Sequence, residues 1–173
     1  MVYLREIETL SQQLGEALIK RNWTITTAES CTGGGISAAI TETAGSSAYF
    51  ERAFVTYSNQ AKAEMLAIPI TLINNNGAVS QQTVEAMAKG AALKANANLA
   101  IAVSGIAGPG GGSDAKPVGT VWVSIFIQYV LDEKTTTQLF SHCFLFSGNR
   151  HSIQQQTIKY SLNKALELTN KII

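Results

Sequence analysis

Residues 23–40 have the sequence WTITTAESCTGGGISAAI, and this stretch sets the fold class. Residues 23–27 are rich in β-branched side chains, which favours a short strand. Three consecutive glycines at 33–35 mark a turn, and residues 36–40 are small and apolar and begin a segment of helical length. The stretch therefore predicts a strand, a turn and a helix in immediate succession.

The same order recurs further along the chain. Residues 52–57 form a strand pattern, and Ser58 and Asn59 are good caps for a helix over residues 60–66. Residues 99–103 are unbroken in their apolarity, which is typical of a strand buried on both faces. A loop rich in glycine and proline follows at residues 108–116.

The remaining segments complete the prediction. We expect an amphipathic helix ending near Asn22, a loop around Pro69, a helix capped by Ser80, and a last helix capped by Asn149. Residues 118–130 and 136–146 have the pattern of an antiparallel strand pair. Alternating helices and strands predict a single α/β domain over residues 1–173. We expect a three-layer α/β/α sandwich with a mixed, mostly parallel sheet.

Composition excludes several classes of protein. The chain has 13 Lys and Arg against 12 Asp and Glu, with no long basic run, so we expect no nucleic-acid binding. The longest apolar stretch, residues 118–130, is too short to span a membrane, and the N-terminus lacks a signal-peptide core. These features predict a cytoplasmic protein without a membrane partner. A charged fraction of only 14% suggests buried self-association surface, hence a homo-oligomer.

Metal and cofactor chemistry is not indicated. The two cysteines and two histidines are not at ligand spacing, so we expect no metal and no cofactor. Residues 33–38 fit G-x-G-x-x-A, and Tyr160 to Lys164 fits the Y-x-x-x-K of short-chain dehydrogenases. However, no acidic residue follows about 20 residues later to hold a ribose, which argues against a dinucleotide-binding oxidoreductase.

The carboxyl ends of parallel strands meet at one edge of a sheet, where ligands bind. Ser30, Tyr57, Lys62 and the glycine-rich loop all follow predicted strands, so we expect them to converge there. Ser30 is a candidate nucleophile beside the amides of a helix N-terminus, which could hold an oxyanion; the alternative role for Ser30 is a helix cap. Lys62 is a candidate base if burial keeps it neutral, or else an exposed lysine of a first helical turn.

Three other side chains are candidates for the same chemistry. Cys31 would share the helix N-terminus and is a rival nucleophile, acidified by the helix. His142 lies on one face of a predicted strand with phenylalanines, where we expect a core histidine. His151 falls in the first turn of the last helix, where we expect it to be solvated.

Six motifs in order resemble one known family, the CinA C-terminal domain family of nicotinamide-nucleotide amidohydrolases, from about Leu10 to Leu168. They are residues 27–34 (TAESCTGG), 45–47 (GSS), 54–62 (FVTYSNQAK), 77–80 (GAVS), 104–111 (SGIAGPGG) and 116–121 (KPVGTV). The resemblance implies a three-layer sandwich that hydrolyses the carboxamide of nicotinamide mononucleotide to the carboxylate, with release of ammonia. The larger domain that often precedes this one would not fit in 173 residues, so we expect the stand-alone form.

The resemblance also assigns roles to residues. It implies Ser30 as nucleophile, Lys62 as general base and Tyr57 as a hydroxyl that assists proton transfer. The implied substrate-binding residues are Thr32, Gly33, Gly34, Ser104 and Gly105 around the amide, and Arg150 at the phosphate.

Two departures from the family pattern concern the phosphate. Asn149 replaces an expected aspartate and Gln154 an expected arginine, which predicts weaker phosphate affinity. A catalytically silent module that binds pyridine nucleotides is the alternative function.

Overall fold

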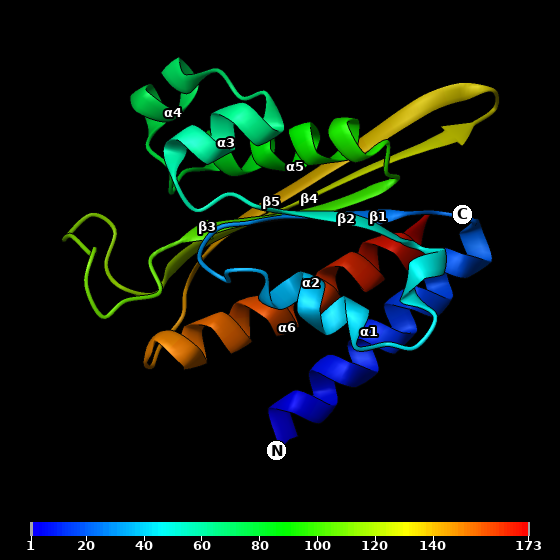
Figure 1. Ribbon diagram of the computed structural model, residues 1–173, viewed down its shortest axis with the longest axis horizontal. Helices are drawn as coiled ribbons and strands as arrows, with labels where there is room; N and C mark the ends of the chain where they lie inside the picture. The colour runs from blue at the N-terminus through cyan, green and yellow to red at the C-terminus, as the bar shows by residue number, and fades with distance from the viewer. Residues whose placement is uncertain (1, 173) are drawn as a thin grey trace.

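A computed structural model describes residues 2–172, with side chains from residue 5 onward, as three layers around a five-stranded sheet (Figure 1). The strands are β1 (Ile25–Glu29), β2 (Phe50–Val55), β3 (Leu99–Gly105), β4 (Thr120–Leu131) and β5 (Lys134–Leu145). Their order is β2-β1-β3-β4-β5, and β4 is antiparallel to both its neighbours. The β1–β2 and β1–β3 pairs are parallel, so the predicted mixed sheet is confirmed.

Helices cover both faces of the sheet. One face carries α1 (Val2–Arg21), α2 (Gly35–Thr41) and α6 (Arg150–Lys171), and the other carries α3 (Asn59–Leu66), α4 (Ile70–Asn76) and α5 (Gln81–Ala95) (Figure 1). A short 3-10 turn, η1 (Ser46–Ala48), precedes β2. Within the described residues, no helix is both long and apolar enough to cross a membrane.

The sheet separates two apolar cores, and the side chains that β3 sends into them differ in size. In β3, Leu99, Ile101 and Val103 point into the core under α1, α2 and α6. The alternate residues Ala100 and Ala102 face α5. Successive side chains of a strand point to opposite faces, so this alternation places the bulky residues on one face and leaves room for α5 to lie close on the other. The unbroken apolarity of this strand follows from its burial on both faces.

Helix α4 replaces the loop that we expected around Pro69, and that expectation is wrong. Pro69 has φ −56°, a value already suited to a helix start, and precedes Ile70 directly. Ile73 of α4 and Ile68 before it are buried in the α5-side core. Burial of these two side chains outweighs the poor helix propensity of three consecutive asparagines.

The expected core position of His142 is also wrong. Strand β5 is the last in the sheet order, so its faces are only partly covered, and His142 is exposed. Its ring packs between Phe140 and Phe144, with ring centroids 6.5 and 4.5 Å away. His151 is exposed at the start of α6, as expected.

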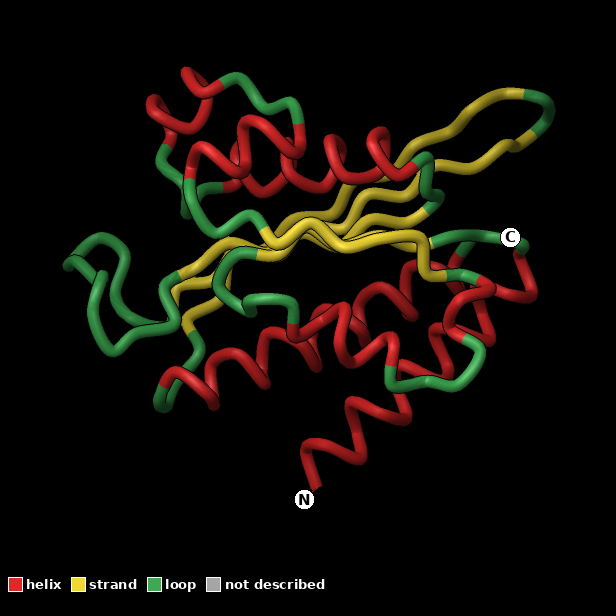
Figure 2. The backbone as a smooth tube through the Cα atoms, viewed as in Figure 1, coloured by secondary structure: helices red, strands yellow, loops and turns green. Residues whose placement is uncertain are grey.

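The carboxyl ends of β1, β2 and β3 meet at one end of the sheet. The loops that leave these strands lie there together with the start of α6 and the glycine-rich loop (Figure 2). Asn149 caps α6 by accepting a 2.9 Å hydrogen bond from the Ser152 amide, and Ser80 caps α5 in the same way. The segments predicted to converge do so.

Candidate active site

A cavity of about 260 Å³ opens at this end of the sheet. Six residues singled out from the sequence line it: Ser30, Tyr57, Lys62, Ser104, Gly105 and Arg150. The other lining residues are Cys31, Ala78, Val79, Ile106, Ala107 and three residues of the glycine-rich loop, Gly108, Gly110 and Gly111. The cavity is thus built from five segments far apart in the sequence.

Ser30 lies directly after β1 and remains attached to the sheet. Its amide donates to the Val103 carbonyl of β3 at 3.1 Å, and its carbonyl accepts from the Gly33 amide. Only 8% of its surface is exposed, yet its side chain reaches the cavity. The hydroxyl is therefore fixed at the strand end rather than used as a helix cap.

Lys62 enters the same site from α3. Ser58 caps this helix by accepting a 3.0 Å hydrogen bond from the Ala61 amide, one residue before Lys62. Lys62 is 1% exposed, and its Nζ lies 3.1 Å from Ser30 Oγ. Nζ also donates to the Thr56 carbonyl at 2.8 Å and to the Tyr57 carbonyl at 3.4 Å.

Burial changes the acidity of both ionisable groups beside Ser30. Desolvation lowers the pKa of the Lys62 ammonium, and no described Asp or Glu forms an ion pair with it. Desolvation also raises the pKa of the Cys31 thiol to about 12, and the negative charge of Glu29 adds to that rise. The expectation that the helix acidifies Cys31 is wrong, because α2 is separated from it by a turn and the thiol is buried.

Glu29 is the residue that sequence reasoning missed. It is fully buried, and its Oε2 accepts from the Thr32 hydroxyl at 2.7 Å and the Ile36 amide at 2.9 Å, while Oε1 accepts from the Ser37 amide at 2.8 Å. The amides of Ile36 and Ser37 are therefore not free to hold an oxyanion, and that expectation is wrong for them. The sequence signal that could have indicated these contacts is a glutamate at a strand end, seven residues before an amide in the first turn of a helix.

The turn after Ser30 places three predicted residues outside the cavity lining. Thr32 points to Glu29, and Gly33 and Gly34 form the turn itself. Gly34 has φ +97°, a conformation that side chains rarely adopt, and it leads into α2. Their role in binding the substrate stays a prediction.

Ser104 and Gly105 form the cavity wall at the end of β3. Ser104 Oγ donates to the Ala78 carbonyl at 2.7 Å and so fixes the α4–α5 connection beside the site. A Cβ on Gly105 would lie 2.8 Å from the Thr120 carbonyl oxygen. Glycine is therefore required here by the close approach of β4.

Arg150 joins the glycine-rich loop to Tyr57 across the cavity mouth. Its Nη1 donates to the Gly108 carbonyl at 2.8 Å and its Nη2 to the Tyr57 hydroxyl at 3.0 Å. Gln154, one turn further along α6, donates to the Cys31 carbonyl at 2.9 Å. The residue that departs from the family pattern thus supports the turn after Ser30.

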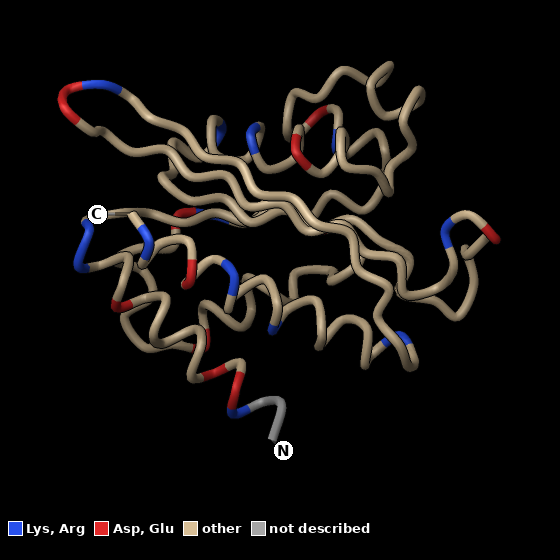
Figure 3. The backbone as a smooth tube through the Cα atoms, turned by 180° about the vertical axis from the view of Figure 1, so that it is seen from behind, with Lys and Arg blue, Asp and Glu red and all other residues tan. Residues whose placement is uncertain are grey.

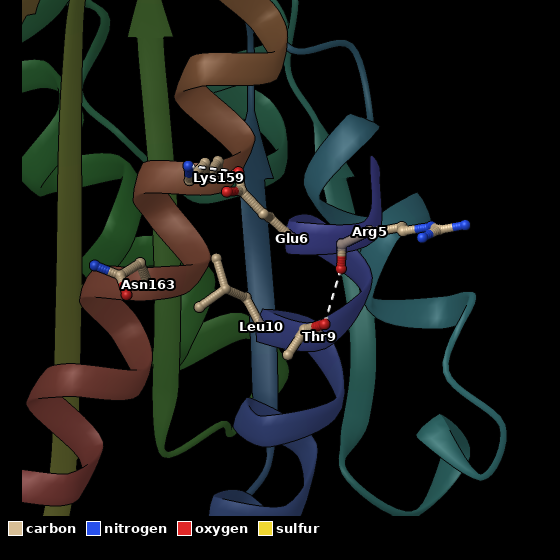
Figure 4. A pocket seen from close by; sticks show the side chains of 6 residues that line it. All are labelled: Arg5, Glu6, Thr9, Leu10, Lys159 and Asn163. Atoms are coloured by element: carbon tan, nitrogen blue, oxygen red, sulfur yellow. Dashed lines mark hydrogen bonds and ion pairs between the residues drawn. The ribbon is translucent and has the colours of Figure 1, made fainter. Parts of the chain in front are cut away.

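Another hollow, of about 520 Å³, lies between α1 and α6 (Figure 4). Glu6 and Lys159 form an ion pair of 2.6 Å across it, and Leu10 points into it. It contains none of the residues predicted to be catalytic. Among residues whose side chains the structure describes, no group of three or more His, Cys, Asp and Glu is arranged to hold a metal.

Replacing Lys62 by methionine should stabilise the fold. Burial keeps the pKa of Lys62 in the folded state below its value of 10.5 in a free chain. At any pH below the folded-state pKa, the full free-energy penalty of burying the ammonium acts against folding. The penalty disappears as pH rises toward 10.5. Lys62→Met should therefore raise the melting temperature at pH 7, by about 2–4 °C per kcal/mol gained, and the gain should shrink toward pH 10. Lys89→Met, at an exposed lysine of α5, is the control; an equal effect there would contradict this account.

Glu29→Gln should weaken the turn that carries Ser30. Glutamine offers one acceptor oxygen where the structure uses two, so its NH2 group would face an amide donor. We expect a loss of about 1–3 kcal/mol in the free energy of unfolding, measured by chemical denaturation. Glu42→Gln, at the exposed residue that follows α2, should change little. Equal stabilities of the two variants would show that the Glu29 contacts are unimportant.

Comparisons with known proteins give the family. The CinA C-terminal domain model matches residues 7–169. The nicotinamide-nucleotide amidohydrolase PncC of Pseudomonas putida is 48% identical over 162 residues, 94% of this chain and 96% of that protein. The PncC of Escherichia coli K12 is 48% identical over 157 residues, 91% of each chain. The crystal structure of competence/damage inducible protein CihA from Agrobacterium tumefaciens superposes with a TM-score of 0.88 at 40% identity, covering 96% of both chains. The chain belongs to the CinA C-terminal domain family.

Proposed function

We propose that this chain hydrolyses the carboxamide of nicotinamide mononucleotide to nicotinic acid mononucleotide and ammonia, through an acyl-enzyme on Ser30. The observation that carries the proposal is the 3.1 Å separation between Ser30 Oγ and Nζ of the buried Lys62. It is supported by the identity of 48% to proteins named nicotinamide-nucleotide amidohydrolase over nearly the whole chain.

The first half of the reaction forms the acyl-enzyme. Neutral Lys62 takes the proton of Ser30 as Oγ attacks the carboxamide carbon. The amide of Cys31, which follows the nucleophile directly, is the donor best placed for the oxyanion, because those of Ile36 and Ser37 are occupied by Glu29. Protonated Lys62 or the Tyr57 hydroxyl then gives a proton to the departing nitrogen, and ammonia leaves.

The second half returns the enzyme to its starting state. Lys62 takes a proton from water, whose oxygen attacks the ester carbon. The tetrahedral intermediate expels Ser30 Oγ, which regains its proton from Lys62. Lowering of the Lys62 pKa by burial serves both halves, since only the neutral amine accepts a proton.

The phosphate of the substrate would bind at Arg150. The guanidinium has five N–H donors, and the Gly108 and Tyr57 contacts leave donors for a phosphate at the cavity mouth. The side chain is exposed and so accessible to a ligand. Thr32, Gly33 and Gly34 would contribute by holding the turn after Ser30, and Ser104 and Gly105 by shaping the wall beside the amide.

Ser30→Ala should abolish ammonia release from nicotinamide mononucleotide, while Cys31→Ala should retain it. The reason is that the Cys31 thiol stays protonated at neutral pH, whereas the Ser30 hydroxyl lies within reach of Lys62. Ammonia is measured with an enzyme-coupled assay. Activity should rise with pH through an apparent pKa below 10.5, since the Lys62 pKa is lowered.

Lys62→Arg tests whether the residue acts as a general base or only as a positive charge. Guanidinium remains protonated, so turnover should fall by about 10²–10⁴-fold, as for loss of a general base. An active Lys62→Arg enzyme would contradict the mechanism. Wild-type protein that binds the mononucleotide but releases no ammonia would favour the silent binding module.

Arg150→Ala should raise the Michaelis constant for the mononucleotide by roughly 10–100-fold, as expected for a lost charge-assisted hydrogen bond. The Michaelis constant for nicotinamide riboside, which has no phosphate, should not change. Tyr57→Phe removes the hydroxyl that we expect to assist proton transfer, and with it a contact to Arg150, but it keeps the guanidinium. It should therefore lower turnover rather than affinity. Equal effects of Arg150→Ala on both substrates would rule out the phosphate role.

A further inference from the structure

Gly110 is unusual among the glycines of this chain. Of the 14 glycines, eight have a positive φ, and five others would place a Cβ within 3.0 Å of a neighbouring atom. Gly110 meets neither condition, because its φ is not positive and a Cβ there would have no atom within 4 Å beyond its chain neighbours. Glycine loses more conformational freedom on folding than alanine does. The fold therefore gives no reason for a glycine at residue 110.

The place of Gly110 in the cavity gives a reason that involves a ligand. Gly110 and Gly111 line the cavity, and both are exposed. Ser30 and Lys62 line the same cavity but are at most 8% exposed. A substrate whose carboxamide reaches Ser30 therefore has its other end near the exposed loop. Because residue 110 has no side chain, the backbone of the loop can be approached closely there.

The amides of Gly110 and Gly111 are available as hydrogen-bond donors. Neither amide has an acceptor among the residues that the structure describes. The carbonyl of Gly108, two residues before Gly110, accepts a 2.8 Å hydrogen bond from Arg150 Nη1. This bond holds the guanidinium beside the loop that carries the two amides. Successive backbone N–H groups in a turn form a common binding surface for anions.

The charges around the cavity also favour an anion. The charged residues between 105 and 119 are Asp114 and Lys116. Figure 3 shows the charges of this loop grouped on one stretch, with the rest of the loop uncharged. No Asp or Glu is among the cavity-lining residues, whereas Lys62 and Arg150 are. A phosphate near Gly110 would therefore meet a cation and no carboxylate from the lining.

We propose that the amides of Gly110 and Gly111 bind the phosphate of the mononucleotide together with Arg150. Residue 110 is glycine because the phosphate occupies the space that a side chain would fill. Backbone donors on the loop and the guanidinium on α6 then hold one anion at the exposed part of the cavity. This inference rests on the mononucleotide that we propose as ligand, but it does not depend on hydrolysis at Ser30.

Gly110→Ala tests this role by steady-state kinetics. The added methyl group should raise the Michaelis constant for the mononucleotide by roughly 10–100-fold, as for a lost charge-assisted contact. Turnover at saturation and the Michaelis constant for nicotinamide riboside should not change. The melting temperature should not fall, because the Cβ meets no neighbouring atom and the φ suits alanine. An unchanged Michaelis constant for the mononucleotide would overturn the proposal.

Ala115→Ser is the matched control in the same loop. It also adds one heavy atom to an exposed residue, but Ala115 does not line the cavity. It should leave both Michaelis constants unchanged. If Ala115→Ser raised the constant for the mononucleotide as much as Gly110→Ala, the effect would come from the loop as a whole and the proposal would be wrong.

A binding experiment separates this inference from the proposed reaction. Ser30→Ala protein labelled with 15N-glycine is titrated and followed by NMR, so that no turnover is needed. The mononucleotide and inorganic phosphate should each move the amide signals of Gly110 and Gly111. Nicotinamide riboside should move the signal of Gly105, at the cavity wall, but not these two.

The outcomes of the titration are distinct. Signals of Gly110 and Gly111 that stay in place with the mononucleotide, or that move equally with the riboside, would overturn the phosphate contact. The expected shifts in a protein whose wild type releases no ammonia would support the phosphate contact and contradict the proposed hydrolysis.

Discussion

Lys62 is buried and has no carboxylate partner among the residues whose side chains the structure describes, and the geometry of the site depends on this constraint. Glu29 is equally buried and adjacent in sequence to Ser30, so it could have paired with the amine. Its two oxygens instead accept three hydrogen bonds from Thr32 and the first turn of α2. An ion pair would have favoured the protonated amine. Because Glu29 bonds to the turn and not to Lys62, desolvation is the dominant influence on the Lys62 pKa. The neutral form of the amine is therefore accessible.

The register of the parallel strands brings the two halves of the site together. The amide of Thr56, at the end of β2, donates to the Glu29 carbonyl at the end of β1, and the Thr56 carbonyl accepts from Lys62 Nζ. Ser30 is held in turn by the Val103 carbonyl of β3. Three neighbouring strand ends therefore fix the distance between hydroxyl and amine, and a shift of one residue in any of them would separate the pair.

The convergence of Ser30, Lys62 and Tyr57 could be predicted, because each follows a strand whose local pattern is clear and parallel strands share an edge. The contacts of Glu29 could not, since they depend on how a turn folds back onto its own strand. Helix α4 was missed because burial of Ile73 decides it against local propensity, and burial is a tertiary property. His142 was misplaced for a related reason: alternation gives the face of a strand, but whether that face is covered depends on strand order in the sheet.

The site divides into a buried part and an exposed part. Ser30 and Lys62 are at most 8% exposed and attached to the sheet, whereas Tyr57 is 64% exposed and Arg150 lies at the cavity mouth. Groups held by strand ends cannot move without disturbing the core, so the distance between Ser30 and Lys62 is rigid. Arg150 is held by a loop carbonyl and a phenol, and its remaining N–H donors are those that we propose for the phosphate. Asn149, next to Arg150, lies near this mouth, whereas Gln154 contacts the Cys31 carbonyl in the turn after Ser30. A substitution at residue 149 can therefore change affinity while the distance between Ser30 and Lys62 stays fixed by the sheet.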